Sequence, residues 1–70
     1  MSSAIEQIVD AYVQLGNRSQ LEDLRLHRQR LIVDLLGRAV AGYDISQPLE
    51  QVKEDLAAVE AGLVRLNEPK

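Results

Sequence analysis

The sequence predicts an all-α protein: an antiparallel helical hairpin preceded by a short N-terminal helix. Apolar residues recur at helical spacing in three segments, and each segment begins near a Ser, a residue type typical of helix N-caps. The core must be aliphatic, because Phe and Trp are absent and Tyr12 and Tyr43 are the only aromatic residues. The 70 residues suffice for one small domain, expected over 1–70. Whether it is a three-helix bundle or a dimeric bundle stays open.

The first helix is expected at about residues 4–15. Ser3 and Glu6 have the spacing of a capping box, in which the Ser hydroxyl accepts a backbone N–H of the first turn and the Glu side chain reaches back to the cap residue. Gly16-Asn17 predicts the end of the helix, since both residue types tolerate the left-handed conformation. Four apolar residues share one helical face: Ile5, Ile8, Val9 and Tyr12.

The second helix is expected at about residues 20–41, with Ser19 and Glu22 as a second capping box. One broad apolar arc contains Leu21, Leu24, Leu31, Ile32, Leu35, Leu36 and Ala39. A separate stripe at seven-residue spacing contains Leu26, Val33 and Val40. A helix that contacts one neighbour needs only one apolar face. This helix is therefore predicted to lie centrally and to contact two neighbours.

The third helix is expected at about residues 48–66, with Ser46 as its N-cap and Pro48 in its first turn. Its apolar seam has the alternating intervals of a heptad pattern: Leu49, Val52, Leu56, Val59, Leu63 and Leu66. Leu56 and Val59 are expected among the most buried residues, against Leu31 and Leu35. The short connection makes the second and third helices antiparallel neighbours. Tyr43, in that connection, is interpreted as a cover for the hairpin end in preference to a recognition tip.

Charge differs between the two long helices. Residues 18–38 contain five Arg and three acidic residues, whereas residues 39–70 contain six acidic and three basic residues. Opposite net charges favour antiparallel docking, although an exposed pair contributes only about 0.2–1 kcal/mol.

No catalytic, cofactor-binding or metal site is predicted, so we expect a protein that is not an enzyme. His27 lies one helical turn after Asp23, a pair that can orient an imidazole or hold a metal. A working site needs a nucleophile or further ligands, and the Ser residues are already explained as caps. The chain lacks Cys, which removes most zinc sites. Asp23 and His27 are therefore interpreted as an exposed polar pair.

The densest basic stretch, with Arg25, Arg28 and Arg30, is the candidate contact for a polyanion. The net charge is -3, and aromatic residues for base stacking are nearly absent. We therefore expect these side chains to form a solvated flank and expect no nucleic-acid partner. A nucleic-acid-associated regulator that uses this segment is retained as an alternative function.

Residues 35–40 (Leu-Leu-Gly-Arg-Ala-Val) lie between a charged helix and a Leu-rich helix. This arrangement resembles the helix–GRxV–helix pattern of small phage head–tail joining proteins. The resemblance implies a non-enzymatic structural component of a phage or phage-like particle, bound in several copies to neighbouring subunits. That family places a short β-hairpin between its helices, whereas here too few residues precede Ser46 for one. No functional residue is carried over.

The leading hypothesis is a helical interaction or assembly protein that self-associates as a dimer or higher oligomer. So short a chain buries only about 60% of its unfolded surface, and association would complete its core. The expected interface contains Leu26, Val33, Val40, Ile5, Ile8 and Tyr12. Residues 1–17 lack the Lys and Arg that are typical of signal and transit peptides. No apolar run approaches the roughly 20 residues of a membrane span. The expected location is cytoplasmic or virion-associated, without a membrane partner.

Overall fold

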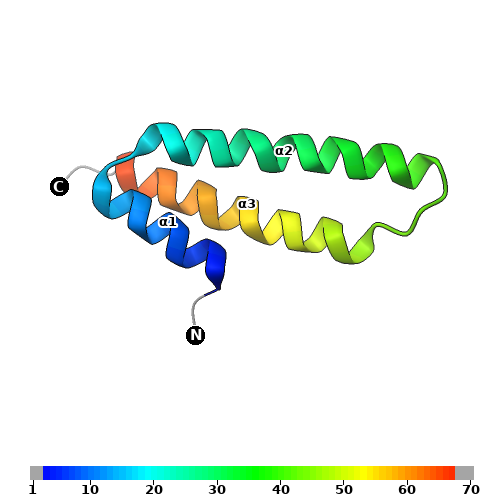
Figure 1. Ribbon diagram of the computed structural model, residues 1–70, viewed down its shortest axis with the longest axis horizontal. Coiled ribbons are helices and arrows are strands. Elements are labelled where there is room, and N and C mark those ends of the chain that lie inside the picture. The colour runs from blue at the N-terminus through cyan, green and yellow to red at the C-terminus, as the bar shows by residue number, and fades with distance from the viewer. Residues whose placement is uncertain (1–2, 68–70) are drawn as a thin grey trace.

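The computed structural model describes residues 3–67 as three helices: α1 (Ala4–Leu15), α2 (Arg18–Val40) and α3 (Ser46–Asn67). Helices α2 and α3 run antiparallel as a long hairpin, and the shorter α1 lies against one end of α3 (Figure 1). Within residues 3–67 there is no strand. The predicted all-α hairpin with a short helix before it is confirmed.

Both ends of α1 lie where they were expected, although Glu6 bonds the Ser3 hydroxyl and not a backbone N–H as in a complete capping box. The hydroxyl of Ser3 accepts the N–H of Glu6 at 3.3 Å and donates to the Glu6 carboxylate at 3.1 Å. Gly16 ends the helix with a φ of 66°, the left-handed conformation that glycine adopts without steric cost. The N–H of Asn17 then donates to the carbonyl of Tyr12 at 2.9 Å, a bond typical of helix C-termini.

Helix α2 begins two residues before the predicted start, and its N-cap is Asn17. The Asn17 side chain accepts the N–H of Gln20 at 3.2 Å, so Ser19 lies inside the first turn. The capping box predicted at Ser19 and Glu22 is therefore wrong. The reason is local: Gly16 turns the chain so sharply that the next residue already occupies the cap position, and Asn is a good cap.

Helix α3 begins at Ser46, which is its first residue and not the cap that was expected. A carboxylate oxygen of Asp44 accepts the Ser46 N–H at 3.0 Å and also accepts the Ser46 hydroxyl. These two bonds stabilise the charged carboxylate and lower the pKa of Asp44, the hydroxyl contributing most. Pro48 lies in the first turn as predicted. An ionised acceptor two residues earlier thus competes successfully with the expected Ser cap.

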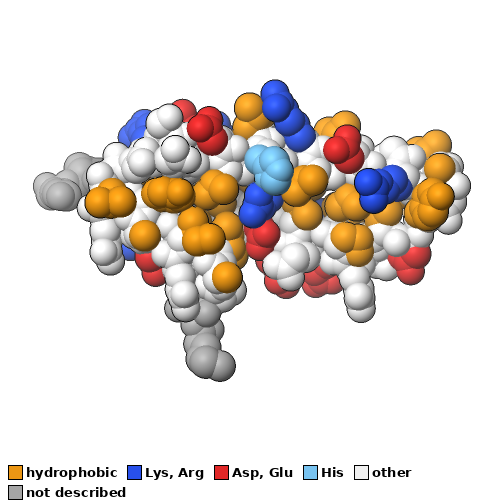
Figure 2. Space-filling view, in the orientation of Figure 1, with side chains coloured by type: hydrophobic (Ala, Val, Ile, Leu, Met, Phe, Trp, Pro, Cys, Tyr) orange, Lys and Arg blue, Asp and Glu red, His pale blue; other side chains and the backbone are white. Residues whose placement is uncertain are grey.

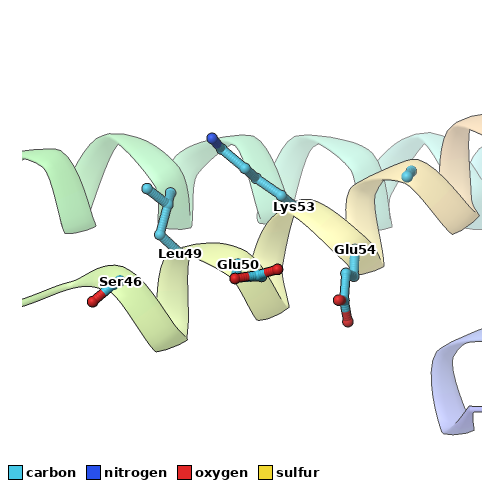
Figure 3. Close-up of a pocket in the computed structure, with 6 residues that line it drawn as sticks. Ser46, Leu49, Glu50, Lys53 and Glu54 are labelled. Atoms are coloured by element: carbon cyan, nitrogen blue, oxygen red, sulfur yellow. The ribbon is translucent and has the colours of Figure 1, made fainter.

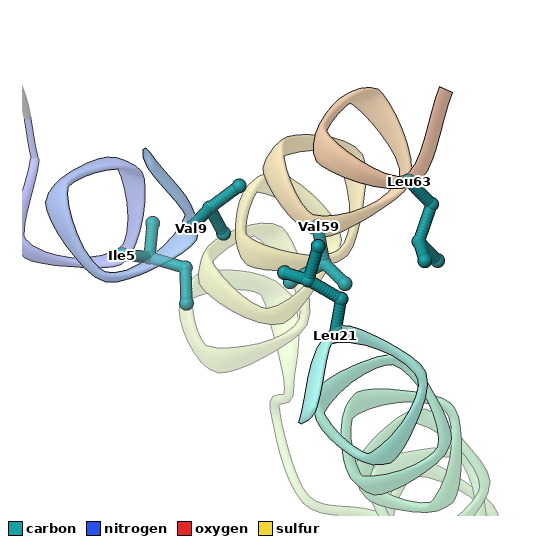
Figure 4. Close-up of a cluster of buried hydrophobic side chains, with 5 residues drawn as sticks. All are labelled: Ile5, Val9, Leu21, Val59 and Leu63. Carbon is teal, nitrogen blue, oxygen red and sulfur yellow. The ribbon is translucent and has the colours of Figure 1, made fainter. Parts of the chain in front are cut away.

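The core lies at the end where all three helices meet. It consists of five buried side chains, drawn in Figure 4: Ile5, Val9, Leu21, Val59 and Leu63. Leu21 and Val59 are fully buried, which confirms the expectation for Val59. Leu56 is only half-buried, so its expected place among the most buried residues is wrong.

The length of α1 explains this uneven burial. Twelve helical residues span about 18 Å, whereas the 22 residues of α3 span about 33 Å. Helix α1 therefore covers only the C-terminal part of α3. The remainder of the hairpin, residues 22–58, contains no buried residue; we call it the hairpin arm.

Helix α1 packs within the chain, chiefly against α3. A Cβ atom placed on Gly62 would lie less than 3.0 Å from Cγ1 of Val9, so the two helices touch closely at a position that requires glycine. A guanidinium nitrogen of Arg65 donates to the carboxylate of Asp10 at 2.6 Å. One end of the molecule is thus a three-helix bundle.

In the hairpin arm, an ion pair links α2 to α3. Nε of Arg28 donates to the carboxylate of Asp55 at 3.3 Å, and both side chains are mostly shielded from solvent. The Gln51 amide donates to the same carboxylate at 3.0 Å. The pair joins the basic helix to the acidic one, in the antiparallel register that their charges favour.

Candidate interaction surface

The outer side of α2 carries a row of exposed apolar side chains, which we call the α2 stripe. Its members are Leu26 (47% exposed), Val33 (68%), Leu36 (50%) and Val40 (91%). The stripe continues the predicted row at 26, 33 and 40, and Leu36 fills a heptad position between them. In Figure 2, hydrophobic side chains along the outer edge of α2 lie among Arg side chains.

Leu36 and Ala39 were predicted on the arc that faces the core, and this placement is wrong because both are exposed. At this end of the molecule α3 is the only neighbour of α2 among residues 3–67. A single neighbouring helix covers a narrow strip, here Leu31, Ile32 and Leu35, which are half-buried. Side chains at the margin of the broad arc therefore remain in contact with solvent.

Tyr43, at the tip of the hairpin, is 69% exposed. It lines a shallow pocket together with Leu35, Arg38, Asp44, Ile45 and Pro48. The interpretation of Tyr43 as a cover for the hairpin end is wrong. Its ring adds exposed surface at the tip of the hairpin arm.

The interface residues predicted on α1 divide into two groups. Ile5 is buried in the core and Tyr12 packs against it, so both are used within the chain. Ile8 is 45% exposed and stays available. On α1, only part of the predicted surface therefore faces solvent.

A second surface feature, which we call the α3 groove, runs along the side of α3 next to α1. One part is lined by Ser46, Leu49, Glu50, Lys53, Glu54 and Ala57, all drawn in Figure 3. The other part lies between α1 and α3 and is lined by Glu6, Val9, Asp10, Glu54, Ala57, Ala58, Ala61, Gly62 and Arg65. Because the two parts share Glu54 and Ala57, they form one continuous groove. Small residues form much of its surface, and carboxylates dominate its charge.

The basic stretch of α2 does not form a common charged face. Arg28 is engaged by Asp55, Arg25 is half-buried, and Arg30 is exposed beside Val33. A guanidinium nitrogen of Arg28 also lies 2.6 Å from Nδ1 of His27. The polyanion contact at Arg25, Arg28 and Arg30 remains a prediction.

His27 lies beside Arg28, and no bond joins it to Asp23 among the described residues. Within residues 3–67, no three His or acidic side chains come together as metal ligands would. No helix in this same range is long and apolar enough to cross a bilayer.

No family model matches the chain, and no curated protein or solved structure matches it either. The resemblance of residues 35–40 to phage head–tail joining proteins remains a prediction. The geometry that bears on function is therefore that of the two surfaces, the α2 stripe and the α3 groove.

Proposed function

We propose that this chain is a non-enzymatic assembly protein that self-associates through the α2 stripe. One observation carries the proposal: four large apolar side chains at heptad positions are about half or more exposed, on an arm without a buried residue. Large apolar side chains gathered on one exposed face of a small protein commonly mark an interface.

The energetics of the arm support a second copy as the occupant. Burying a large aliphatic side chain completely contributes roughly 1.5–3 kcal/mol, so covering the partly exposed stripe contributes on the order of 5 kcal/mol. Association must also offset the lost rotational and translational freedom of the two molecules, so only the surplus over this cost appears as affinity. A chain whose buried core is confined to one end gains particularly from such a contact.

Gly37 provides an independent argument. A glycine inside a helix is about 1 kcal/mol less favourable than alanine, and a Cβ at Gly37 would have no neighbour within 4 Å. Gly62, by contrast, is required by its contact with Val9. Gly37 follows Leu36 in the sequence and lies one turn after Val33, at the edge of the stripe. Close approach by a helix of another molecule explains a glycine there.

Sedimentation over a range of concentrations tests the proposal. The parent chain should associate at tens of micromolar, and Val33→Glu should be monomeric because a carboxylate cannot be buried without a partner. Leu15→Glu is the matched control, since Leu15 is exposed but lies at the end of α1, outside the stripe. It should associate like the parent.

The second variant, Gly37→Ala, separates association from folding. It should raise the free energy of unfolding of the monomer by about 0.4–1 kcal/mol while weakening association, because the added methyl group holds the partner away. A parent chain that stays monomeric at hundreds of micromolar contradicts the proposal. Unchanged association of Val33→Glu does so as well.

A further inference from the structure

We infer that the α2 stripe of one copy docks into the α3 groove of a second copy, in a head-to-tail arrangement. The inference rests on the proposed self-association and adds the surface that receives the stripe. Two different surfaces then meet at each contact, so every copy offers one of each.

The two surfaces lie on opposite sides of the hairpin. On α3, the groove residues Glu54, Ala57 and Ala61 are exposed, whereas the seam residues Val52 and Leu56 are half-buried on the side of α2. On α2, the stripe lies on the side away from α3. A stripe therefore cannot reach the groove of its own chain, and a contact between them must link successive copies.

The charges of the two surfaces are complementary. By helical register, Arg25 and Arg30 flank the stripe on its two sides, although the acidic residues Glu22, Asp23 and Asp34 also lie on α2. The described parts of α1 and α3 contain six acidic and two basic residues, and the groove itself exposes Glu6, Glu50 and Glu54. Arg65 is already paired with Asp10, which leaves Lys53 as the cation along the groove that the structure shows without an ion pair.

A symmetric contact between two stripes lacks this complementarity. It would bring Arg25 and Arg30 of one copy against the α2 helix of another, whose net charge is positive, so the like charges repel. Contact with the groove instead places Arg25 and Arg30 near carboxylates. Figure 2 shows acidic side chains along the edge of α3, and along α2 it shows Arg side chains with some acidic ones between them.

The shapes of the two surfaces are also complementary. The stripe presents bulky side chains, of which Val33 and Val40 project furthest into solvent. The groove presents the small and exposed side chains of Ala57 and Ala61, which leave room for the ridge of an incoming helix. Ridges fit grooves better than they fit other ridges, so size and charge favour the same pairing.

A complementation experiment tests the inference. Val33→Glu disables the stripe but keeps the groove, and Ala57→Arg fills the groove with a bulky cation but keeps the stripe. Ala57 is exposed, so the substitution leaves the core intact, and circular dichroism of each variant should show the helix content of the parent. Ala11→Arg, at an exposed position of α1 outside the groove, is the matched control.

At a concentration where the parent is associated, each disabling variant alone should be monomeric and the control should associate normally. An equimolar mixture of Val33→Glu and Ala57→Arg should form a heterodimer, identified by its mass in native mass spectrometry, because one intact stripe and one intact groove remain.

The possible results distinguish an error in the receiving surface from an error in the proposed self-association. If Ala57→Arg associates like the parent while Val33→Glu does not, the groove is not the receiving surface, and the proposed self-association still stands. If both variants are monomeric and their mixture gives no heterodimer, the head-to-tail pairing is wrong. A monomeric parent overturns both the inference and the proposed function.

Discussion

The close contact between α1 and α3 at Gly62 predicts how Gly62→Ala changes the stability of the protein. Whether this substitution stabilises or destabilises the fold depends on one neighbouring side chain, that of Val9. Gly62→Ala would place a methyl group against Cγ1 of Val9, and also 3.4 Å from Val13 and 3.7 Å from Leu21. The last two distances are ordinary van der Waals contacts. The clash with Val9 is serious, because that side chain is β-branched, buried and unable to change rotamer freely.

Two opposing contributions set the size of the change in the free energy of unfolding. Alanine is about 0.8–1.0 kcal/mol more favourable than glycine in a helix interior. Overpacking a well-filled core costs about 1–3 kcal/mol. The clash should win, so Gly62→Ala should lower the free energy of unfolding by about 1 kcal/mol, which corresponds to a fall in Tm of about 4–8 °C in a domain of this size.

A double-mutant cycle with Val9→Ala isolates the contact. Removing Cγ1 of Val9 leaves a cavity that the methyl group introduced at position 62 can occupy, so in this background Gly62→Ala should stabilise the protein by about 0.5–1 kcal/mol. The coupling energy should reach about 1.5–2 kcal/mol. Denaturant unfolding followed by circular dichroism measures all four chains. The packing of α1 would be refuted if Gly62→Ala stabilised the parent, or had the same effect in both backgrounds.

Four further predictions follow from the caps, the core, the turn and the arm. Asn17→Ala should cost about 0.5–2 kcal/mol of unfolding free energy and Ser19→Ala much less, since only Asn17 caps α2; equal costs would contradict this assignment. Leu21→Ala should cost about 2–5 kcal/mol in thermal or denaturant unfolding, because the side chain is fully buried. NMR titration should show a pKa of Asp44 below its ordinary value, and Ser46→Ala should raise it. The contact with Ser46 therefore stabilises the fold above the ordinary pKa of Asp44 and is lost as pH falls through the lowered pKa. Hydrogen exchange in dilute solution should be faster in the hairpin arm than at the three-helix end, and association should slow it; uniform protection would argue against an unsupported arm.

The helices themselves were predictable because their signals are local. The spacing of Ser3 and Glu6, the glycine at position 16 and the heptad seam of α3 each act within one or two turns. Such features need no partner distant in sequence. The seven-residue spacing of Val33 and Val40 is a local signal of the same kind, and it sets these residues on a face of their own.

Competition between neighbouring caps was not predictable from spacing alone. Asn17 and Ser19 are both good caps, as are Asp44 and Ser46. The turn at Gly16 places Asn17 at the N-cap of α2. At the start of α3, the ionised carboxylate of Asp44 accepts the N–H of Ser46. These outcomes depend on backbone geometry that sequence patterns do not specify.

The extent of burial along the hairpin was decided by the tertiary structure. Periodicity shows which side of a helix is apolar, but it does not show how far a neighbouring helix extends along that side. Here α1 ends after about 18 Å, so Val59 is buried and Leu56, one turn earlier, is only half-buried. Leu36 is exposed for the same reason. The sequence by itself therefore determined three helices and their apolar faces, and packing alone determined which of those faces the chain leaves uncovered.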